Sequence, residues 1–143
     1  MNSSKPNLYS LPEKQIIDMP ESSYMNAMQL SFFKSRLLAL YVATQDRIEE
    51  ARKQIALPMG SSDENDRASS EEQVIVALRI VDREQKLLPK IQQSLKRIRT
   101  GTYGYCLESD EPIGIPRLLA RPTAEYCAEV KAIIEIQEKH YNG

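Results

Sequence analysis

The sequence predicts a mostly α-helical fold, with a long antiparallel coiled-coil hairpin followed by a small turn-rich unit and a C-terminal helix. Two long stretches, residues 21–57 and 61–88, contain neither glycine nor proline, the residues that most often interrupt helices. Within each stretch apolar side chains recur every three or four residues, as on one face of a helix. Glycine and proline gather instead at residues 58–60 and 101–122. These positions predict the turn of the hairpin and the turn-rich unit.

Each half of the expected hairpin carries one narrow apolar stripe. The first stripe contains Leu30, Phe33, Leu37, Leu40, Thr44, Ile48, Ala51 and Ile55. The second contains Val74, Leu78, Val81, Gln85, Leu88, Ile91, Leu95 and Ile98. A stripe of this width suits two helices packed on each other better than a globular core, which needs a wider apolar face. We therefore expect three segments: a flexible N-terminal tail over residues 1–23, the hairpin over 24–100 with its tip near 59–68, and the turn-rich unit with the last helix over 101–143. Thr123 is the expected start of that helix.

Composition excludes several classes of protein. The chain has 143 residues, a formal net charge of −1, 41% hydrophobic and 27% charged residues, which excludes a wholly disordered or collagen-like chain. The longest apolar run, residues 37–43, is far shorter than the roughly 20 residues of a membrane span. The first residues are polar and show no signal peptide. We expect a cytoplasmic monomer that binds neither membranes nor, given its charge, DNA directly.

Charge is unevenly distributed along the chain. Residues 59–73 carry five acidic side chains against one arginine, whereas residues 83–99 carry six basic side chains against one glutamate. Such runs are commonly no more than solvated helix faces. The alternative is functional: an acidic tip that acts as a probe, and a basic region that binds a phosphate-bearing ligand.

Short motifs in a fixed order resemble a known family. The turn-rich unit contains Tyr-Gly-Tyr-Cys (103–106) and Arg-Pro-Thr-Ala (121–124), and the tip contains Asp-x-x-Asp-Arg-Ala (63–68). Tyr-Met-Asn (24–26) precedes the first long helix, and Asp-Arg-Glu (82–84) lies in the second. Together, over some 120 residues, they resemble the DksA/TraR family of bacterial transcription regulators.

The resemblance implies a non-enzymatic regulator that binds RNA polymerase. In this family the hairpin enters the secondary channel of the polymerase, and tip residues act near the active site; the matching positions are Asp63, Asp66 and Ala68. The family also binds ppGpp, the effector of the stringent response, at its interface with polymerase. The positions that match this ppGpp site are Leu87, Lys90, Arg121 and Lys131, with Arg83 and Lys86 as possible supporting residues.

The resemblance also indicates where zinc would be bound. Zinc-binding members use two Cys-x-x-Cys pairs, and the matching positions here are Cys106, Ser109, Cys127 and Val130. Structural zinc prefers four cysteine or histidine ligands, so we expect a degenerate zinc-finger-like region that requires no metal or other cofactor. Substitute carboxylates, from Glu108, Asp110 or Glu129, would make an unusual site.

Two other classes of function are compatible with parts of the sequence. A structural or adaptor coiled coil would pair with another protein through an exposed stripe, but it has no need of the acidic tip motif. A direct nucleic-acid binder would use the basic stretch 83–99, against which the acidic tip and the net charge argue. A polymerase cleavage factor is a variant of the leading interpretation.

Overall fold

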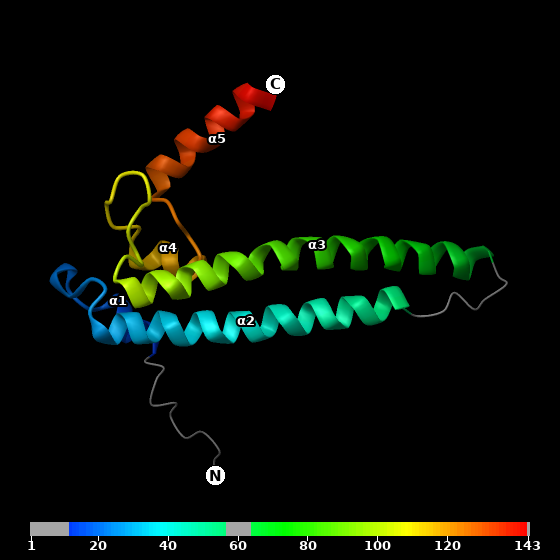
Figure 1. Cartoon of the computed structure of the whole chain (residues 1–143), viewed down its shortest axis with the longest axis horizontal. Helices are drawn as coiled ribbons and strands as arrows, with labels where there is room; N and C mark the ends of the chain where they lie inside the picture. The colour runs from blue at the N-terminus through cyan, green and yellow to red at the C-terminus, as the bar shows by residue number, and fades with distance from the viewer. Residues whose placement is uncertain (1–11, 57–63, 143) are drawn as a thin grey trace, which may run out of the picture. The chain divides into compact units, whose positions relative to one another are not determined.

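The computed structural model describes residues 12–56 and 64–142, without the side chains of residues 64–66 and 142. The elements in chain order are α1 (Glu13–Ile17), the 3-10 turn η1 (Glu21–Ser23), α2 (Ala27–Ala56), α3 (Glu64–Thr100), α4 (Ile115–Ala120) and α5 (Ala128–Asn142) (Figure 1). The described segments contain no β-strand, only an isolated bridge between Tyr105 and Pro112. The expected mostly helical class is confirmed.

The chain divides into two compact units, which we describe separately. The hairpin unit comprises residues 38–92, and the terminal unit comprises, of the described residues, 12–37 and 93–142. This division differs from the three segments expected from the sequence, because the first turns of α2 and the last turns of α3 belong to the terminal unit.

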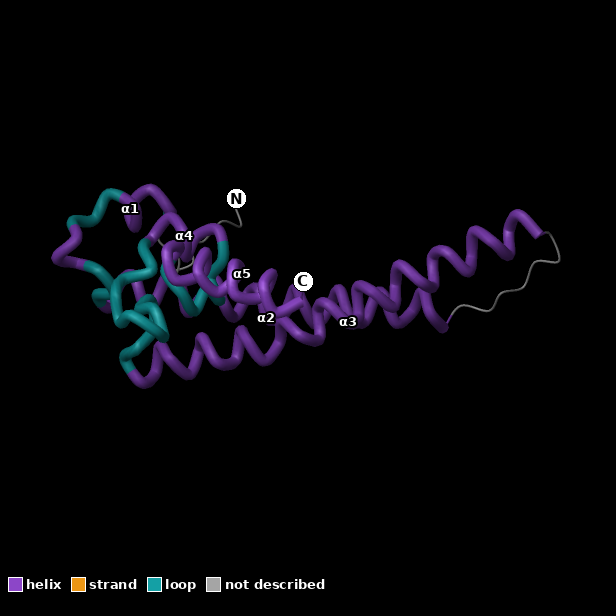
Figure 2. Tube along the Cα trace, turned by 90° about the horizontal axis from the view of Figure 1, so that it is seen from above, coloured by secondary structure: helices purple, strands orange, loops and turns teal. Residues whose placement is uncertain are grey.

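In the hairpin unit, α2 and α3 run side by side in opposite directions (Figures 1 and 2). Thr44, Ile48 and Ala51 of α2 are buried, as the first stripe predicts. The second stripe is only partly right, since Ile91 is buried but Leu78 is 52% exposed.

The inner positions of α3 near these residues belong instead to Ala77 and Glu84, each one residue before a position of the expected stripe. Gln85, which the stripe placed inside, is exposed. The physical reason is a charged partner on the other helix: Arg47 pairs with Glu84 and lets a carboxylate occupy a buried position.

Pro89 lies inside α3 without ending it. Because proline has no backbone N–H, the carbonyl of Gln85 lacks the usual intrahelical donor four residues on. Pro89 is exposed, which leaves that carbonyl near solvent. The helix therefore continues past the proline to Thr100.

The terminal unit is built on a compact apolar core. Phe33 and Tyr103 pack with ring centroids 5.7 Å apart, and Leu37, Ile113 and Leu118 are buried in the same unit. This core joins the base of the hairpin helices to the turn-rich region that follows α3.

Residues 12–23 do not form the flexible tail that we expected. Ile16 of α1 is fully buried, and α1 packs against α4. The carboxylate of Glu13 accepts a hydrogen bond from Arg36 at 2.6 Å. Burial of one isoleucine stabilises by roughly 2 kcal/mol, so this contact is one of several that hold the segment on the terminal unit; residues 1–11 lie outside the described part.

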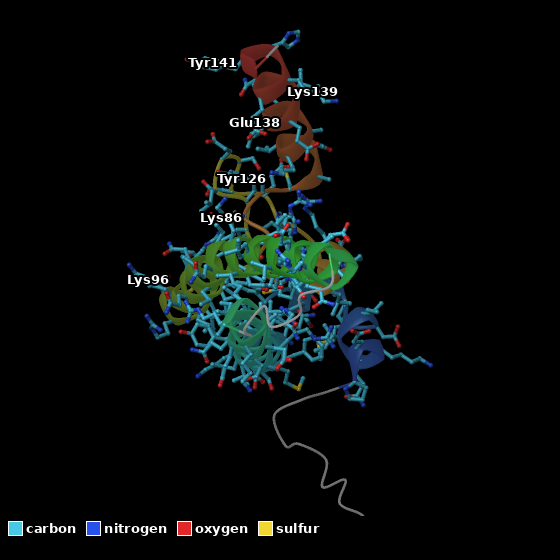
Figure 3. The ribbon with its side chains drawn as sticks, turned by 90° about the vertical axis from the view of Figure 1, so that its right-hand side faces the viewer. Lys86, Lys96, Tyr126, Glu138, Lys139 and Tyr141 are labelled. Carbon is cyan, nitrogen blue, oxygen red and sulfur yellow. The ribbon has the colours of Figure 1, made fainter. Side chains whose placement is uncertain are left out.

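The last helix begins at Ala128, later than the predicted Thr123. Thr123 is instead buried in the segment before the helix. Figure 3 shows the side chains of Lys139 and Tyr141 projecting from the final turns of α5, and Tyr141 is 94% exposed. None of the described helices is both long enough and apolar enough to cross a bilayer.

Candidate functional site

The turn-rich region brings three of the four former ligand positions together. The loop after Cys106 closes through hydrogen bonds from Cys106 N to Glu111 O at 2.8 Å and from Asp110 N to Cys106 O at 3.0 Å. Leu107 N donates to Glu125 O at 2.9 Å, which ties this loop to the segment that contains Cys127. As a result the Oγ of Ser109 lies 3.8 Å from the Sγ of Cys127.

The Cys106 thiol sits among hydrogen-bond donors. Burial opposes its ionisation, but the Ser109 hydroxyl and the backbone N–H groups of Cys127, Ser109 and Glu108 together lower the pKa of Cys106 to about 7. Both cysteines are buried free thiols. This region thus stabilises a thiolate through hydrogen bonds from the protein.

The donor set does not fit a structural zinc site. Two thiols remain, the third position offers a neutral hydroxyl, and the fourth is Val130, a half-buried aliphatic side chain with no donor atom. Within the described ranges no three His, Cys, Asp or Glu side chains are close enough together to hold a metal ion. The substitute carboxylates considered from the sequence therefore do not complete a site either.

Tyr24 fastens the N-terminal segment to the turn-rich region. Its hydroxyl donates to Gly104 O at 2.6 Å and accepts a hydrogen bond from Gly114 N at 2.9 Å. Its ring meets that of Tyr105 edge-on, with centroids 5.5 Å apart. The Tyr-Met-Asn motif was identified from the sequence only by resemblance, and the structure gives its tyrosine a physical role.

Arg97 is a buried residue, although in the sequence it is only one member of a basic run. It is 6% exposed, and its guanidinium donates to the carbonyls of Thr102, at 2.9 Å, and Tyr105. No carboxylate of the described residues forms an ion pair with it. Arg97 also lines a cavity of about 430 Å³ with Lys96. The hydrogen bonds from the Arg97 guanidinium to these two carbonyls hold the end of α3 to the loop that follows. The number of basic residues in this stretch does not predict that role.

The expected tip residues are only partly described. Asp63 lies outside the described residues, and Asp66 is in the first turn of α3, where side chains are not described. Ala68 is exposed. The acidic tip motif therefore remains a prediction from the sequence.

The positions expected to bind ppGpp are divided between the two units. In the hairpin unit Leu87 is half-buried and Lys90 is exposed; in the terminal unit Arg121 is exposed and Lys131 is half-buried. The Lys86 ammonium lies 3.1 Å from the Asp82 carboxylate, with both side chains largely exposed. None of the described ion pairs includes Lys90, Arg121 or Lys131.

The two parts of the chain match two family models. Residues 29–98 match the model described as DnaK suppressor protein DksA, N-terminal domain. Residues 101–135 match the prokaryotic dksA/traR C4-type zinc finger, although only two of its four cysteines are present in this chain.

Similar whole proteins are known as well. The RNA polymerase-binding transcription factor DksA of Caulobacter vibrioides is 40% identical over 124 residues, covering 84% of this chain and 81% of that protein. The protein of the same name from Salmonella typhimurium is 39% identical, covering 88% and 84% respectively. The structure of transcription factor DksA2 from Pseudomonas aeruginosa matches with a TM-score of 0.77 and 43% identity, covering 90% of this chain and all of that one.

Proposed function

Because this chain belongs to the DksA family, we propose that it binds RNA polymerase and, with ppGpp, modulates transcription initiation without needing zinc. The observation that carries the proposal is the match of fold and sequence over nearly the whole chain to relatives named RNA polymerase-binding transcription factors. Under this proposal the protein is a regulator rather than an enzyme. It acts in the cytoplasm as a monomer and makes no direct contact with DNA.

The hairpin is the element proposed to enter the secondary channel of the polymerase. α2 has 30 residues, and at 1.5 Å per residue it is about 45 Å long; its part after Leu37 belongs to the hairpin unit. A slender pair of such helices suits a narrow channel better than a globular domain would. Asp63, Asp66 and Ala68 are the residues proposed to act at the polymerase active site.

The ppGpp site is proposed to use Leu87, Lys90, Arg121 and Lys131. Lysine and arginine supply the positive charge that a pyrophosphate requires, and arginine adds a bidentate fork. The exposure of Lys90 and Arg121 supports this role, because neither side chain has to leave a packed interior to reach a ligand.

Arg83 is proposed to support the same interface. It lies 3.6 Å from Glu84 and its side chain is 71% exposed, whereas Arg47 contacts that carboxylate at 2.7 Å. Since Arg47 already neutralises Glu84, Arg83 can turn toward a partner without leaving a buried charge unpaired.

The hydrogen bonds and apolar contacts of the turn-rich region support the proposal that the protein does not need zinc. Backbone hydrogen bonds close the loop at Cys106, and Tyr103, Ile113 and Leu118 are buried around it. These contacts supply folding free energy that a structural metal contributes in a four-cysteine unit.

The proposal is tested by an Asp66→Asn variant assayed with purified RNA polymerase. We expect the variant to bind polymerase as the wild type does and to lose its effect on transcription, because one carboxylate of the tip motif is neutralised without a change of shape. Glu72→Gln, an exposed residue of α3, is the matched control and should keep the full effect. A wild-type protein that does not bind polymerase would refute the proposal and favour the adaptor alternative.

A further inference from the structure

A polar layer crosses the hairpin between α2 and α3, with Glu84 and Thr44 buried and the Arg47 side chain 44% exposed. The Glu84 carboxylate, with its side chain 6% exposed, accepts hydrogen bonds from Arg47 Nε at 2.7 Å and from an Arg47 terminal nitrogen at 3.5 Å. The same terminal nitrogen donates to Thr44 Oγ1 at 3.1 Å, and the threonine hydroxyl donates to Leu40 O at 2.7 Å. The layer is therefore connected from the backbone of α2 to the side chain of α3.

We propose that the Arg47–Glu84 pair is a positioning element that fixes the register of the two hairpin helices. By fixing the register, it sets the axial position of the turn of α3 that contains Asp66 and Ala68 relative to α2. Its consequence for transcription rests on the function proposed above, whereas the register itself is a property of the isolated protein.

The apolar packing beyond this layer specifies register only weakly. Beyond Ile48, the buried residues on the tip side are small, Ala51 on α2 and Ala77 on α3, and alanines fit one another equally well after a slip of one turn. An open groove of about 660 Å³ on this flank is lined in part by Ala51, Val76, Ala77 and Ile80. The close packing that would favour one alignment is therefore incomplete on this side of the hairpin.

The polar layer does not tolerate alternative alignments. In an antiparallel pair, a slip of one turn moves Glu84 from Arg47 to the level of Ala43 or Ala51. The carboxylate would then lose its 2.7 Å partner across the hairpin and keep only the longer contact with Arg83 of its own helix, which is unfavourable at a buried position. A single polar position is a known means of selecting one register in coiled coils, at some expense of stability.

The neighbouring arginine does not replace Arg47 in this role. Arg83 is on the same helix as Glu84, so their contact at 3.6 Å moves with α3 and is indifferent to register. Only the pair between the helices, Arg47 with Glu84, distinguishes one alignment from another.

The decisive variant is R47L/E84L, which removes both charges and leaves neither buried alone. Pulsed EPR distances between spin-labelled non-canonical residues at Gln45 and Glu71, exposed positions on α2 and α3, report the register of the full-length protein. We expect one narrow distance in the wild type. In R47L/E84L we expect a broader distribution or a second population displaced by roughly 5 Å, one helical turn, with a melting temperature equal to or above that of the wild type.

Two further variants separate register from packing. The reversed pair R47E/E84R should restore the single EPR distance. The control R52L/E72L removes exposed charges of the same helices and should show the same single distance as the wild type. Should R47L/E84L fail to fold, E84M, which keeps the length of the side chain but removes both its charge and its hydrogen-bond acceptors, is compared in the same way and should broaden the distribution. A single unshifted distance in R47L/E84L, or in E84M if that variant is needed, would overturn the proposal.

The effect on transcription is measured separately with the same variants. R47L/E84L should reduce the maximal effect at saturating protein while leaving the concentration for half-maximal binding to polymerase unchanged, because the base of the hairpin is intact. The reversed pair should recover the maximal effect. If the wild type itself has no effect on transcription, the proposed function fails, but the EPR distances still decide whether the pair sets the register.

Discussion

The hydroxyl of Ser109 lies 3.8 Å from the Sγ of Cys127, at a position where a four-cysteine unit would carry a thiolate. A serine hydroxyl is a poor zinc ligand, but it donates hydrogen bonds well. It also helps to lower the pKa of Cys106. The former metal site is therefore a small hydrogen-bonded cluster, and the pH dependence of stability is the property that reports on it.

Stability should depend on pH through Cys106. Its pKa is lowered from 9.0 in the free side chain to about 7 in the folded protein, so between these values the folded state has lost a proton that the unfolded state still binds. The free energy of unfolding should therefore rise with pH from about 7 to about 9 and fall as pH drops through about 7. Chemical denaturation across this range measures the slope. Cys106→Ser should lack this contribution, and an identical slope in that variant would contradict it.

Replacing Tyr24 by phenylalanine should destabilise the terminal unit by about 1–2 kcal/mol. The variant keeps the ring contact with Tyr105 but leaves Gly114 N–H without its side-chain acceptor and removes a hydrogen bond to Gly104 O. Urea denaturation of the full chain gives the difference. Tyr141→Phe, at a 94% exposed position, is the matched control and should change nothing; equal stability of both variants would mean that the Tyr24 hydroxyl has no net effect.

Alanine should be tolerated less well at Gly104 than at Gly101. Both glycines have positive φ, +92° and +81°, so alanine costs about 1–2 kcal/mol of backbone strain at either position. At Gly104 the new methyl group would also meet Met25 Cγ and Sδ at 2.8 Å, whereas nothing lies within 4 Å at Gly101. Melting temperatures should therefore fall further for Gly104→Ala. Equal melting temperatures would show that the Met25 side chain moves away freely, and the reverse order would contradict the prediction.

Removing the charge of Lys90 or Arg121 should weaken the response to ppGpp and spare the response without it. Each alanine variant loses a cation that the proposed site needs for the pyrophosphate, and at exposed positions the fold should be unaffected. Transcription measured over a range of ppGpp concentrations should show a higher half-maximal concentration. Lys53→Ala, an exposed residue near the end of α2, should behave as the wild type, and an unchanged ppGpp response in both Lys90 and Arg121 variants would exclude these residues from the site.

The sequence predicted the helical hairpin well because its main signals are local. The gaps in glycine and proline marked both long helices, and the stripe through Thr44, Ile48 and Ala51 is buried as expected. On α3 the same reasoning favoured Leu78 over Ala77, since it ranks residues by hydrophobicity. Hydrophobicity alone does not reveal that Glu84 can be buried because its partner, Arg47, lies 37 positions away in the sequence.

Other features depend on contacts between distant segments, which no local pattern reveals. Ile16 is buried although α1 has only five residues, and the carbonyl contacts of Arg97 depend on where the chain turns after α3. Of the candidate site residues, the structure places Cys106, Ser109 and Cys127 in one cluster. The roles of the tip and of the ppGpp positions remain predictions, because they depend on a partner surface.

The most direct test of zinc-independent regulation is transcription from a ribosomal RNA promoter by purified polymerase, with and without ppGpp, using protein whose zinc content has been measured. Protein purified without added metal and dialysed against a chelator should contain well under one equivalent of zinc and should still alter transcription, more strongly with ppGpp. Stoichiometric zinc in that protein, or an effect on transcription that disappears with the chelator and returns with zinc, would contradict the proposal that the protein works without zinc.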